Sequence, residues 1–164
     1  MRKTFLACLV VALVALAPGS VLAYSGTGWD PDDRPESLDP DIRYTTRSVF
    51  SLSGVRYLKV ELGAYEEISD WWRAYAFLDT QDGPAFDYRM HFGNFDTGGT
   101  DCEVWFHNDS ASAVDGLFKQ AGTVASCRVP LKAVHPDKRI RWYLRSPTMH
   151  SGRADRAPDE GWYR

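Results

Sequence analysis

The sequence predicts an all-β protein, an antiparallel β-sandwich or jelly roll of about seven or eight strands with one disulfide. Three observations lead to this prediction. Apolar residues alternate with a period of two on both sides of a turn within residues 71–92, short alternating segments recur between Gly-, Pro- and Asp-rich turns, and two cysteines follow an apolar N-terminal segment. No long helical period and no internal repeat is visible in the chain.

The clearest element is a β-hairpin over residues 71–92. Alternate residues of its first half share one side of an extended chain, and alternate residues of its second half match them across the turn Asp82-Gly83-Pro84. The expected buried face consists of Trp72, Ala74, Ala76, Leu78, Phe86, Tyr88, Met90 and Phe92.

Further strands are expected over 42–52, 56–62, 102–107, 123–129 and 139–145, with a polar loop at 108–112 and a helical turn at 130–137. Together they form one β-sandwich domain over residues 42–150. Residues 24–41 are rich in Asp, Pro and Gly, so we expect a polar acidic leader without helix or strand. Residues 151–164 are expected to form an irregular C-terminal tail.

The N-terminus has the pattern of a signal peptide over residues 1–23. Arg2 and Lys3 precede an apolar run that ends before Pro18, and cleavage is expected after Ala23. The alternative is an uncleaved anchor, although the apolar run is short for a membrane span. We therefore expect a secreted, extracellular protein with no membrane insertion after cleavage.

Cys102 and Cys127 are the two cysteines of the mature chain, and in an exported protein two cysteines most simply pair. A disulfide across this loop would stabilise the fold by about 3–4 kcal/mol. The alternative, a metal thiolate site, lacks the spacing that such sites require.

The charge of the chain argues against two classes of partner. Without Arg2 and Lys3, 17 basic residues remain against 22 acidic ones, a net charge of −5. With no Lys/Arg run in the sequence, nucleic acid and anionic membrane surfaces are poor partners. We expect a monomer.

Acidic loops raise the possibility of a structural Ca²⁺, because this cation binds carboxylate and backbone oxygens together. The leader and the tail would supply the first candidate set of ligands, and the hairpin turn an alternative set. Asp is also an ordinary turn residue, so turn chemistry explains the same clusters. No other cofactor is expected. The first set is Asp30, Asp32, Asp33, Asp155 and Asp159, and the alternative set is Asp79, Asp82 and Asp87.

The sequence assigns no catalytic residue. The four histidines lack zinc-site spacing, and no Gly-x-Ser-x-Gly motif marks a nucleophile. Glycoside hydrolysis needs two carboxylates across a cleft, and Glu61 and Glu103, the only glutamates well inside predicted strands, are the candidates for a small glycan hydrolase. Outward polar positions on half-exposed strands explain these two residues equally well.

One row of aromatic residues is a candidate ligand platform. Trp71, Tyr75 and Phe77 share the second face of the first hairpin strand. If this face is open to solvent, the rings can stack on sugars; if a further layer covers it, they belong to the core.

Three segments together resemble uncharacterised secreted β-sandwich proteins of actinobacteria. They are the leader Asp30-Pro-Asp-Asp-Arg-Pro-Glu-Ser-Leu-Asp-Pro-Asp-Ile42, the hairpin segment from Leu78 to Tyr88, and the tail Asp155-Arg-Ala-Pro-Asp-x-Gly161. The resemblance implies a small exported domain with no established activity, and it assigns no catalytic residue to this chain. It differs at Pro40-Asp41, which is inserted in the leader.

These observations favour a secreted, non-catalytic module that binds an extracellular glycan or protein. A small secreted glycan hydrolase with a jelly-roll fold is the alternative, and a secreted inhibitor or adhesion protein is the second alternative.

If leader and tail share a Ca²⁺, excess EDTA lowers the Tm of the protein and added Ca²⁺ restores it, because the ion binds the folded state only. Differential scanning fluorimetry measures both steps. An unchanged Tm in EDTA would mean that no Ca²⁺ stabilises the fold.

Overall fold

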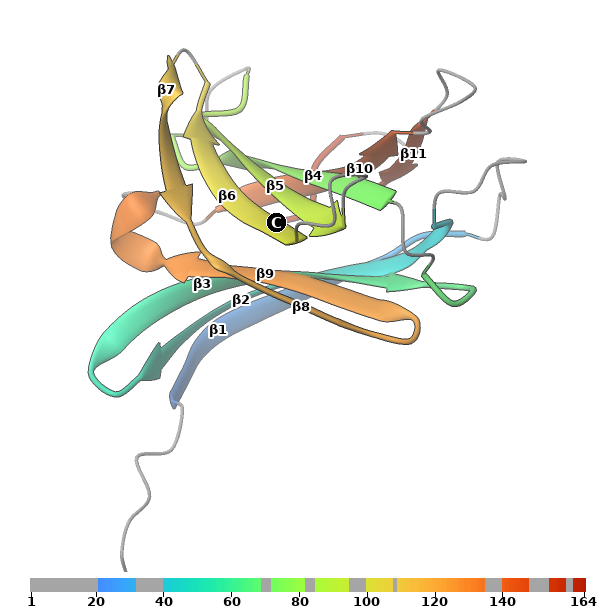
Figure 1. Ribbon diagram of the computed structural model, residues 1–164, viewed down its shortest axis with the longest axis horizontal. Helices are drawn as coiled ribbons and strands as arrows, with labels where there is room; N and C mark the ends of the chain where they lie inside the picture. The colour runs from blue at the N-terminus through green and yellow to red at the C-terminus, as the bar shows by residue number, and fades with distance from the viewer. Residues whose placement is uncertain are drawn as a thin grey trace, which may run out of the picture.

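Two antiparallel sheets packed face to face make up the computed structural model of the chain (Figure 1). The structure describes residues 21–31, 40–68, 72–81, 85–94, 100–107, 109–134, 140–147, 154–158 and 161–164. The five-stranded sheet has the order β1-β2-β3-β9-β8, and the six-stranded sheet has the order β11-β10-β4-β5-β6-β7. The predicted all-β antiparallel sandwich is confirmed.

The strands of the five-stranded sheet are β1 (Val21–Trp29), β2 (Ile42–Leu52), β3 (Val55–Ala64), β8 (Leu117–Ala121) and β9 (Val124–Pro130). Those of the six-stranded sheet are β4 (Trp72–Asp79), β5 (Tyr88–Asn94), β6 (Thr100–Phe106), β7 (Asp109–Asp115), β10 (Arg141–Pro147) and β11 (Ala154–Ala157). One 3₁₀ turn, η1 (Leu131–Ala133), follows β9 inside the range predicted for a helical turn.

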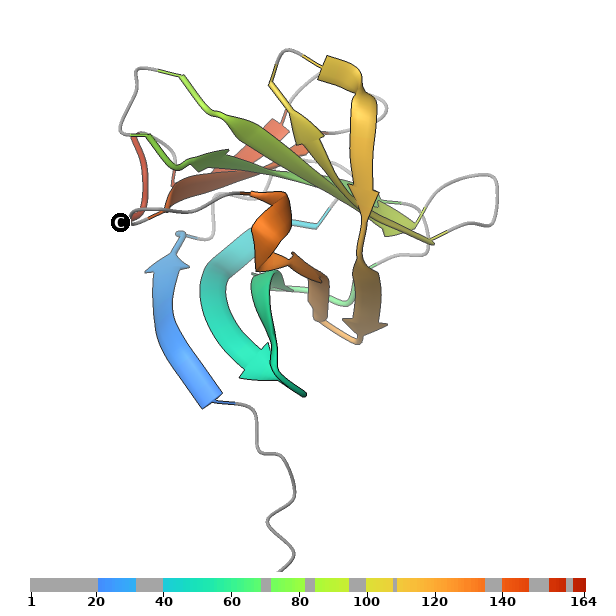
Figure 2. The ribbon, with the colours of Figure 1, turned by 90° about the vertical axis from the view of Figure 1, so that its left-hand side faces the viewer.

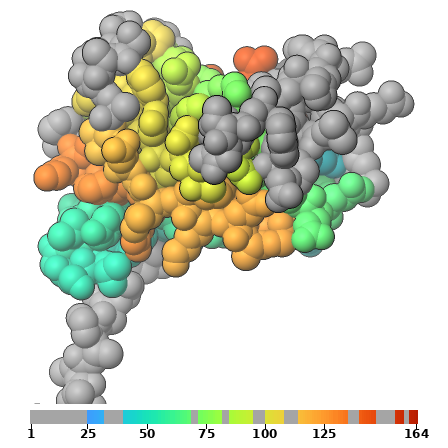
Figure 3. All heavy atoms as spheres, in the orientation of Figure 1, coloured from blue at the N-terminus to red at the C-terminus, as the bar shows by residue number. Residues whose placement is uncertain are grey.

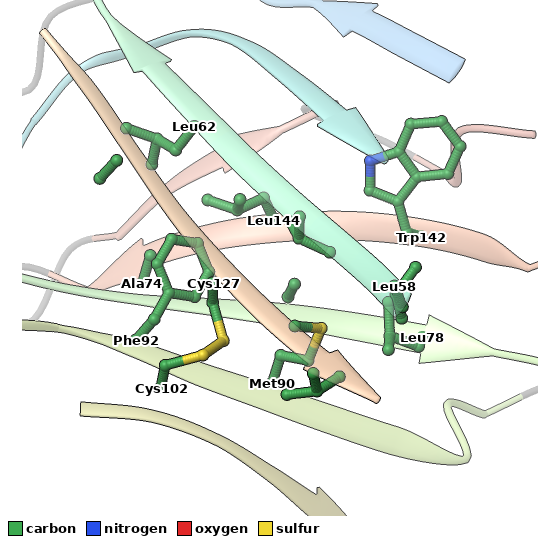
Figure 4. Close-up of a cluster of buried hydrophobic side chains, with 14 of the residues drawn as sticks. Leu58, Leu62, Ala74, Leu78, Met90, Phe92, Cys102, Cys127, Trp142 and Leu144 are labelled. Atoms are coloured by element: carbon green, nitrogen blue, oxygen red, sulfur yellow. A yellow bond between two sulfur atoms is a disulfide. The ribbon is translucent and has the colours of Figure 1, made fainter. Parts of the chain in front are cut away.

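The core lies between the two sheets and is built by inward-facing residues of β2, β3 and β9 on one side and of β4, β5, β6, β10 and β11 on the other (Figure 4). β3 contributes Leu58, Val60 and Leu62, and the six-stranded sheet contributes side chains of β4, β5 and β10 to the same cluster. Each fully buried Leu or Phe contributes about 1.5–3 kcal/mol of hydrophobic stabilisation. The largest fully buried side chains include Trp72, Trp142, Phe92, Leu78, Met90 and Leu144.

The predicted disulfide between Cys102 and Cys127 is confirmed. It joins β6 of one sheet to β9 of the other, with a Cα–Cα distance of 5.3 Å (Figure 4). Gly116 lies against this bridge, because a Cβ at that position would overlap Sγ of Cys102. The bridge therefore crosses the sandwich where the chain passes from β7 to β8.

The predicted hairpin is confirmed, since β4 and β5 are antiparallel neighbours with Leu78 opposite Tyr88. The prediction for Phe86 is wrong. Phe86 precedes β5 and packs outward against Phe77, with ring centroids 4.8 Å apart. The reason is local: Asp87 Oδ2 accepts hydrogen bonds from N and Oγ1 of Thr80, and this tight loop breaks the alternation before the strand begins.

The leader was expected to contain no strand, and this expectation is wrong for its first part, where β1 pairs with β2. Its glycines, which argued against a strand, make room for rings of the opposite sheet. A Cβ at Gly26 would lie 2.7 Å from Cη2 of Trp142, and one at Gly28 would overlap the Tyr163 ring. The glycines of β1 thus leave the space that the rings of Trp142 and Tyr163 fill.

The tail is likewise not irregular throughout. β11 pairs with β10, and Tyr163 forms a bridge with Trp142 through two backbone hydrogen bonds of 2.8 and 3.2 Å. Tyr163 also donates its hydroxyl hydrogen to the carbonyl of Trp29 at 3.0 Å. The first and last described segments, β1 and residues 161–164, therefore both belong to the sandwich.

The described part of the chain has eleven strands rather than seven or eight, and β7 and β8 account for two of the additional ones. The expected polar loop at 108–112 falls largely in β7. In β8, Gln120 faces inward and its Oε1 accepts a hydrogen bond from Nε1 of Trp72 at 2.8 Å. An inward polar residue hides the apolar alternation by which a strand is recognised.

The two sheets are also joined by polar side chains from β2 and β11. The buried guanidinium of Arg47 donates to the carbonyl of Ile140 and lies 4.5 Å from the Trp142 ring centroid. The buried Asp155 carboxylate accepts a hydrogen bond from N of Ile42 at 2.5 Å. Each buried charged group thus has a partner, as burial of a charge requires.

The predicted signal peptide lies almost wholly outside the described residues. β1 begins at Val21, and its pairing with β2 shifts between Leu22 and Tyr24, at the predicted cleavage site. From Tyr24 onward the pairing is regular. Among the residues that the structure describes, no helix has the length and apolar character needed to cross a membrane.

The contact between Gly28 and Tyr163 generates a prediction. Gly28→Ala should lower the free energy of unfolding by about 2 kcal/mol, because the added methyl forces the Tyr163 ring out of its position. Urea denaturation measures the change.

The double variant tests the cause. In a Tyr163→Ala background, Gly28→Ala should be nearly neutral, since the ring is gone. An equal loss in both backgrounds would mean that the C-terminal segment does not pack on β1.

Candidate binding face

The outer side of the six-stranded sheet carries a group of aromatic side chains that, among the described residues, contact one another outside the core. Its strands alternate between buried and half-buried residues. Successive side chains of a strand point to opposite sides, so the half-buried ones point away from the other sheet. That sheet forms a separate layer in Figure 2. We call this surface the outer aromatic face. It consists of Tyr75, Phe77, Phe86, His91, Trp105, Tyr143 and Trp162.

The register of the strands arranges this face in two rows that run across the sheet. The first row passes from β11 to β7 through residues that lie directly opposite one another: Arg156, Arg145, Tyr75, His91, Glu103 and Asp115. The second row passes from β10 to β6 through Tyr143, Phe77, Arg89 and Trp105.

The rings of the two rows stack on one another across neighbouring strands. Tyr75 and His91 are nearly parallel, with centroids 4.8 Å apart and an interplanar angle of 10°. Phe77 and Tyr143 are 4.5 Å apart at 15°. Rings that stack along the plane of a sheet stand upright on it, so their edges point to solvent.

Arginines occupy further ring faces. Arg156 places its guanidinium carbon 4.4 Å from the Tyr143 centroid, and Arg89 lies 5.5 Å from that of Tyr75. Because β10 lies between β4 and β11, Phe77 and Arg156 approach Tyr143 from opposite sides. Both faces of that ring are therefore covered, and the face as a whole presents ring edges and cations.

His91 lies at the centre of the first row and is neutral at pH 7. Burial lowers its pKa from 6.5 to about 4; the positive charges of Arg73 and Arg89 also lower it, and Asp101 opposes them. Burial raises the pKa of Tyr143, against the opposite effects of Arg156 and Arg145. The centre of the first row, at Tyr75 and His91, is thus uncharged.

Two of the three residues predicted as a ligand platform lie on this face. Tyr75 and Phe77 point outward and are half-buried against other rings. Trp71 lies outside the described residues. The sequence prediction missed the contributions of β5, β10 and the tail, because His91, Tyr143 and Trp162 come beside Tyr75 and Phe77 only through strand pairing. Tyr143 could have been found from the sequence, because it alternates with the inward residues of the strand predicted over 139–145.

The leader and the tail meet at the start of β2, as the first Ca²⁺ prediction requires, but the described side chains make no metal site. Asp155 binds N of Ile42, and N of Asp30 donates to the carbonyl of Arg43 at 3.0 Å. Within the described ranges no group of three or more His, Cys, Asp or Glu side chains is placed to hold a metal ion. Asp32, Asp33 and Asp159 lie outside those ranges, so the Ca²⁺ stays a prediction.

The alternative acidic set shows turn chemistry at its two described residues. Asp79 pairs with Arg141 and accepts a hydrogen bond from N of Gln81 at 3.0 Å. Asp87 accepts two hydrogen bonds from Thr80, as described above. Asp82 lies outside the described residues, so a metal at this turn stays a prediction.

Glu61 and Glu103, the residues required by the hydrolase alternative, lie on opposite outer faces of the sandwich. Glu103 is in the first row of the outer aromatic face and accepts a hydrogen bond from Nε1 of Trp105 at 2.9 Å. Glu61 lies on β3 and pairs with Lys59 at 2.8 Å. The core separates the two carboxylates, so they cannot act on one glycosidic bond.

Glu61 belongs to a shallow groove of about 480 Å³ on the outer side of the five-stranded sheet. In the space-filling view, residues of β8 and β9 form the orange surface beside the teal β2–β3 hairpin (Figure 3). The lining of the groove carries three cations and one carboxylate, and the lining residues are Ser48, Phe50, Lys59, Glu61, Leu117, Lys119, Ser126 and Arg128.

No protein-family model matches the chain, and no curated protein or solved structure is significantly similar to it. The resemblance to secreted actinobacterial proteins therefore stays a prediction.

The lowered pKa of His91 predicts a loss of stability in acid. Between pH 6.5 and 4 the unfolded state binds a proton at this residue and the folded state does not, so stability present above pH 6.5 is lost as the pH falls. From pH 7.5 to pH 5, the free energy of unfolding should fall by about 1 kcal/mol more in wild type than in His91→Gln. This figure allows for solvent screening at the half-buried site.

Urea denaturation at the two pH values measures the difference. His107→Gln, which removes an exposed imidazole at the end of β6, is the matched control and should behave as wild type. Parallel pH profiles for wild type and His91→Gln would contradict the assignment.

Proposed function

We propose that this protein is a non-catalytic extracellular module that binds another protein through the outer aromatic face. The observation that carries the proposal is the combination of half-buried aromatic edges and arginines on one open side of a rigid sheet. Protein interfaces are enriched in Tyr, Trp, Phe and Arg, and these residues dominate their energetics.

The ring geometry favours a protein over a glycan. A sugar stacks on the flat face of an aromatic ring, but Phe77 and Arg156 cover the faces of Tyr143, and His91 covers one face of Tyr75. Upright rings instead offer edges and grooves between them, which suit interdigitating side chains. The proposal belongs to the class of secreted inhibitors and adhesion proteins.

The predicted signal peptide and the disulfide support an extracellular location, because disulfides persist in oxidising compartments. The separation of Glu61 and Glu103 leaves the hydrolase alternative without the pair of carboxylates that it was expected to use.

A photo-crosslinker tests the proposal. p-Benzoylphenylalanine at the exposed Arg89 position should give a defined protein adduct in the native extracellular medium, and the same group at Lys119 should not. Lys119 is an exposed position on the outer side of the other sheet, so it serves as the matched control. Denaturing electrophoresis with mass spectrometry identifies the adduct.

Phe77→Thr, which removes the ring and places a β-branched residue that suits a strand, should abolish the adduct at position 89. Absence of any protein adduct at position 89, or an adduct that persists unchanged in Phe77→Thr, overturns the proposal.

A further inference from the structure

We infer that the partner bound by the outer aromatic face is a second copy of the same chain, in a two-fold symmetric dimer. This inference rests on the proposed protein-binding function and names its partner. It follows from the order of charges along the two rows of the face.

The first row is antisymmetric in charge about its midpoint. Its β11–β10 end carries two cations, its centre two neutral rings, and its β6–β7 end two carboxylates. The midpoint lies between β4 and β5, at the stacked pair of Tyr75 and His91. A surface with this order complements its own copy, provided that the copy is reversed along the row.

A two-fold axis lying in the interface, parallel to the strands and above this midpoint, performs that reversal. It turns the copy to face the first molecule and exchanges β4 with β5, β10 with β6, and β11 with β7. Arg145 then faces Glu103 of the copy, and Arg156 faces Asp115. Such an isologous contact is the commonest kind of interface between identical chains.

The same axis also produces complementary pairs in the second row. Phe77 comes to face Arg89 of the copy, and Tyr143 comes to face Trp105. A cation against an aromatic ring and two aromatic rings in contact are both favourable. Sheets packed face to face keep their strands within about 30° of each other, so twist adjusts this arrangement without changing which strands meet.

The charge order is unfavourable within a single chain. Arg145 lies directly opposite Arg156, and Glu103 lies directly opposite Asp115, although like charges in opposed positions destabilise a sheet. A reversed copy places an opposite charge over each of these four residues. Six strands at about 4.8 Å spacing make a face about 24 Å wide, a small interface, so we expect a Kd of about 1–100 μM.

Sedimentation velocity of the purified chain over 1–500 μM, bracketing the Kd expected above, tests the inference. Wild type should form dimers in a concentration-dependent manner, more weakly at high salt because the charge pairs are partly exposed. Arg145→Glu alone and Glu103→Arg alone should each weaken dimerisation about tenfold or more, because each puts like charges face to face. Lys119→Glu on the opposite side of the molecule should behave as wild type.

Restoring the charge pairs shows whether the single variants fail to dimerise because of charge repulsion or because they are misfolded. The double variant Arg145→Glu/Glu103→Arg should dimerise again, and an equimolar mixture of the two single variants should form heterodimers, since both charge pairs become attractive. Circular dichroism melting confirms that every variant is folded.

A wild-type chain that stays monomeric at every concentration, or single variants that do not associate on mixing, overturns the dimer. The crosslinking experiment distinguishes failure of the dimer from failure of the proposed protein-binding function. A monomeric chain that still gives a protein adduct at position 89 leaves protein binding standing with a different partner, and a monomeric chain with no adduct overturns both.

Discussion

The burial of one side of each sheet against the other is the constraint on which the rest of this structure depends. Because side chains of a strand alternate, strands that bury Leu58, Ala74 or Leu144 inward must turn their neighbours outward. The Cys102–Cys127 bridge ties the two sheets to each other across the core. Once the inner faces are fixed, antiparallel pairing determines which outward side chains become neighbours, so the two rows of the outer aromatic face follow from the packing of the core.

The first and last described segments contribute to the same packing. Arg47 on β2 lies against Trp142, Asp155 on β11 holds N of Ile42, and Tyr163 covers Gly28 on β1. These contacts bring the beginning and the end of the described chain to one edge of the sandwich. Trp162, the neighbour of Tyr163, points to the other side and packs at 4.7 Å against Tyr143. The segment that closes the core therefore also extends the outer aromatic face.

The sequence correctly predicted the elements that can be recognised from their own residues, without knowledge of distant contacts. The hairpin of β4 and β5 and the disulfide required only local alternation and a count of cysteines. The missed strands depend on distant residues: Gly26 and Gly28 suit a strand because Trp142 and Tyr163 fill the space, and Gln120 faces inward because Trp72 donates to it. Outward positions such as Tyr75 were identifiable from the sequence, but its contact with His91 depends on the register between strands.

The order of charges also determines how two copies can meet. An axis running along the rows, instead of along the strands, would place Arg145 over Arg145 of the copy and Glu103 over Glu103. Repulsion at both ends disfavours that arrangement, so the same residues that attract in one orientation exclude the other, as specific interfaces require. The neutral centre of Tyr75 and His91 adds no repulsion where the axis passes, because burial keeps His91 uncharged near pH 7. Had cations and carboxylates alternated along the row, opposite charges would lie opposite each other within each chain, and each chain would be more stable alone. Their segregation gives up stability within the chain and specifies the orientation of the pair.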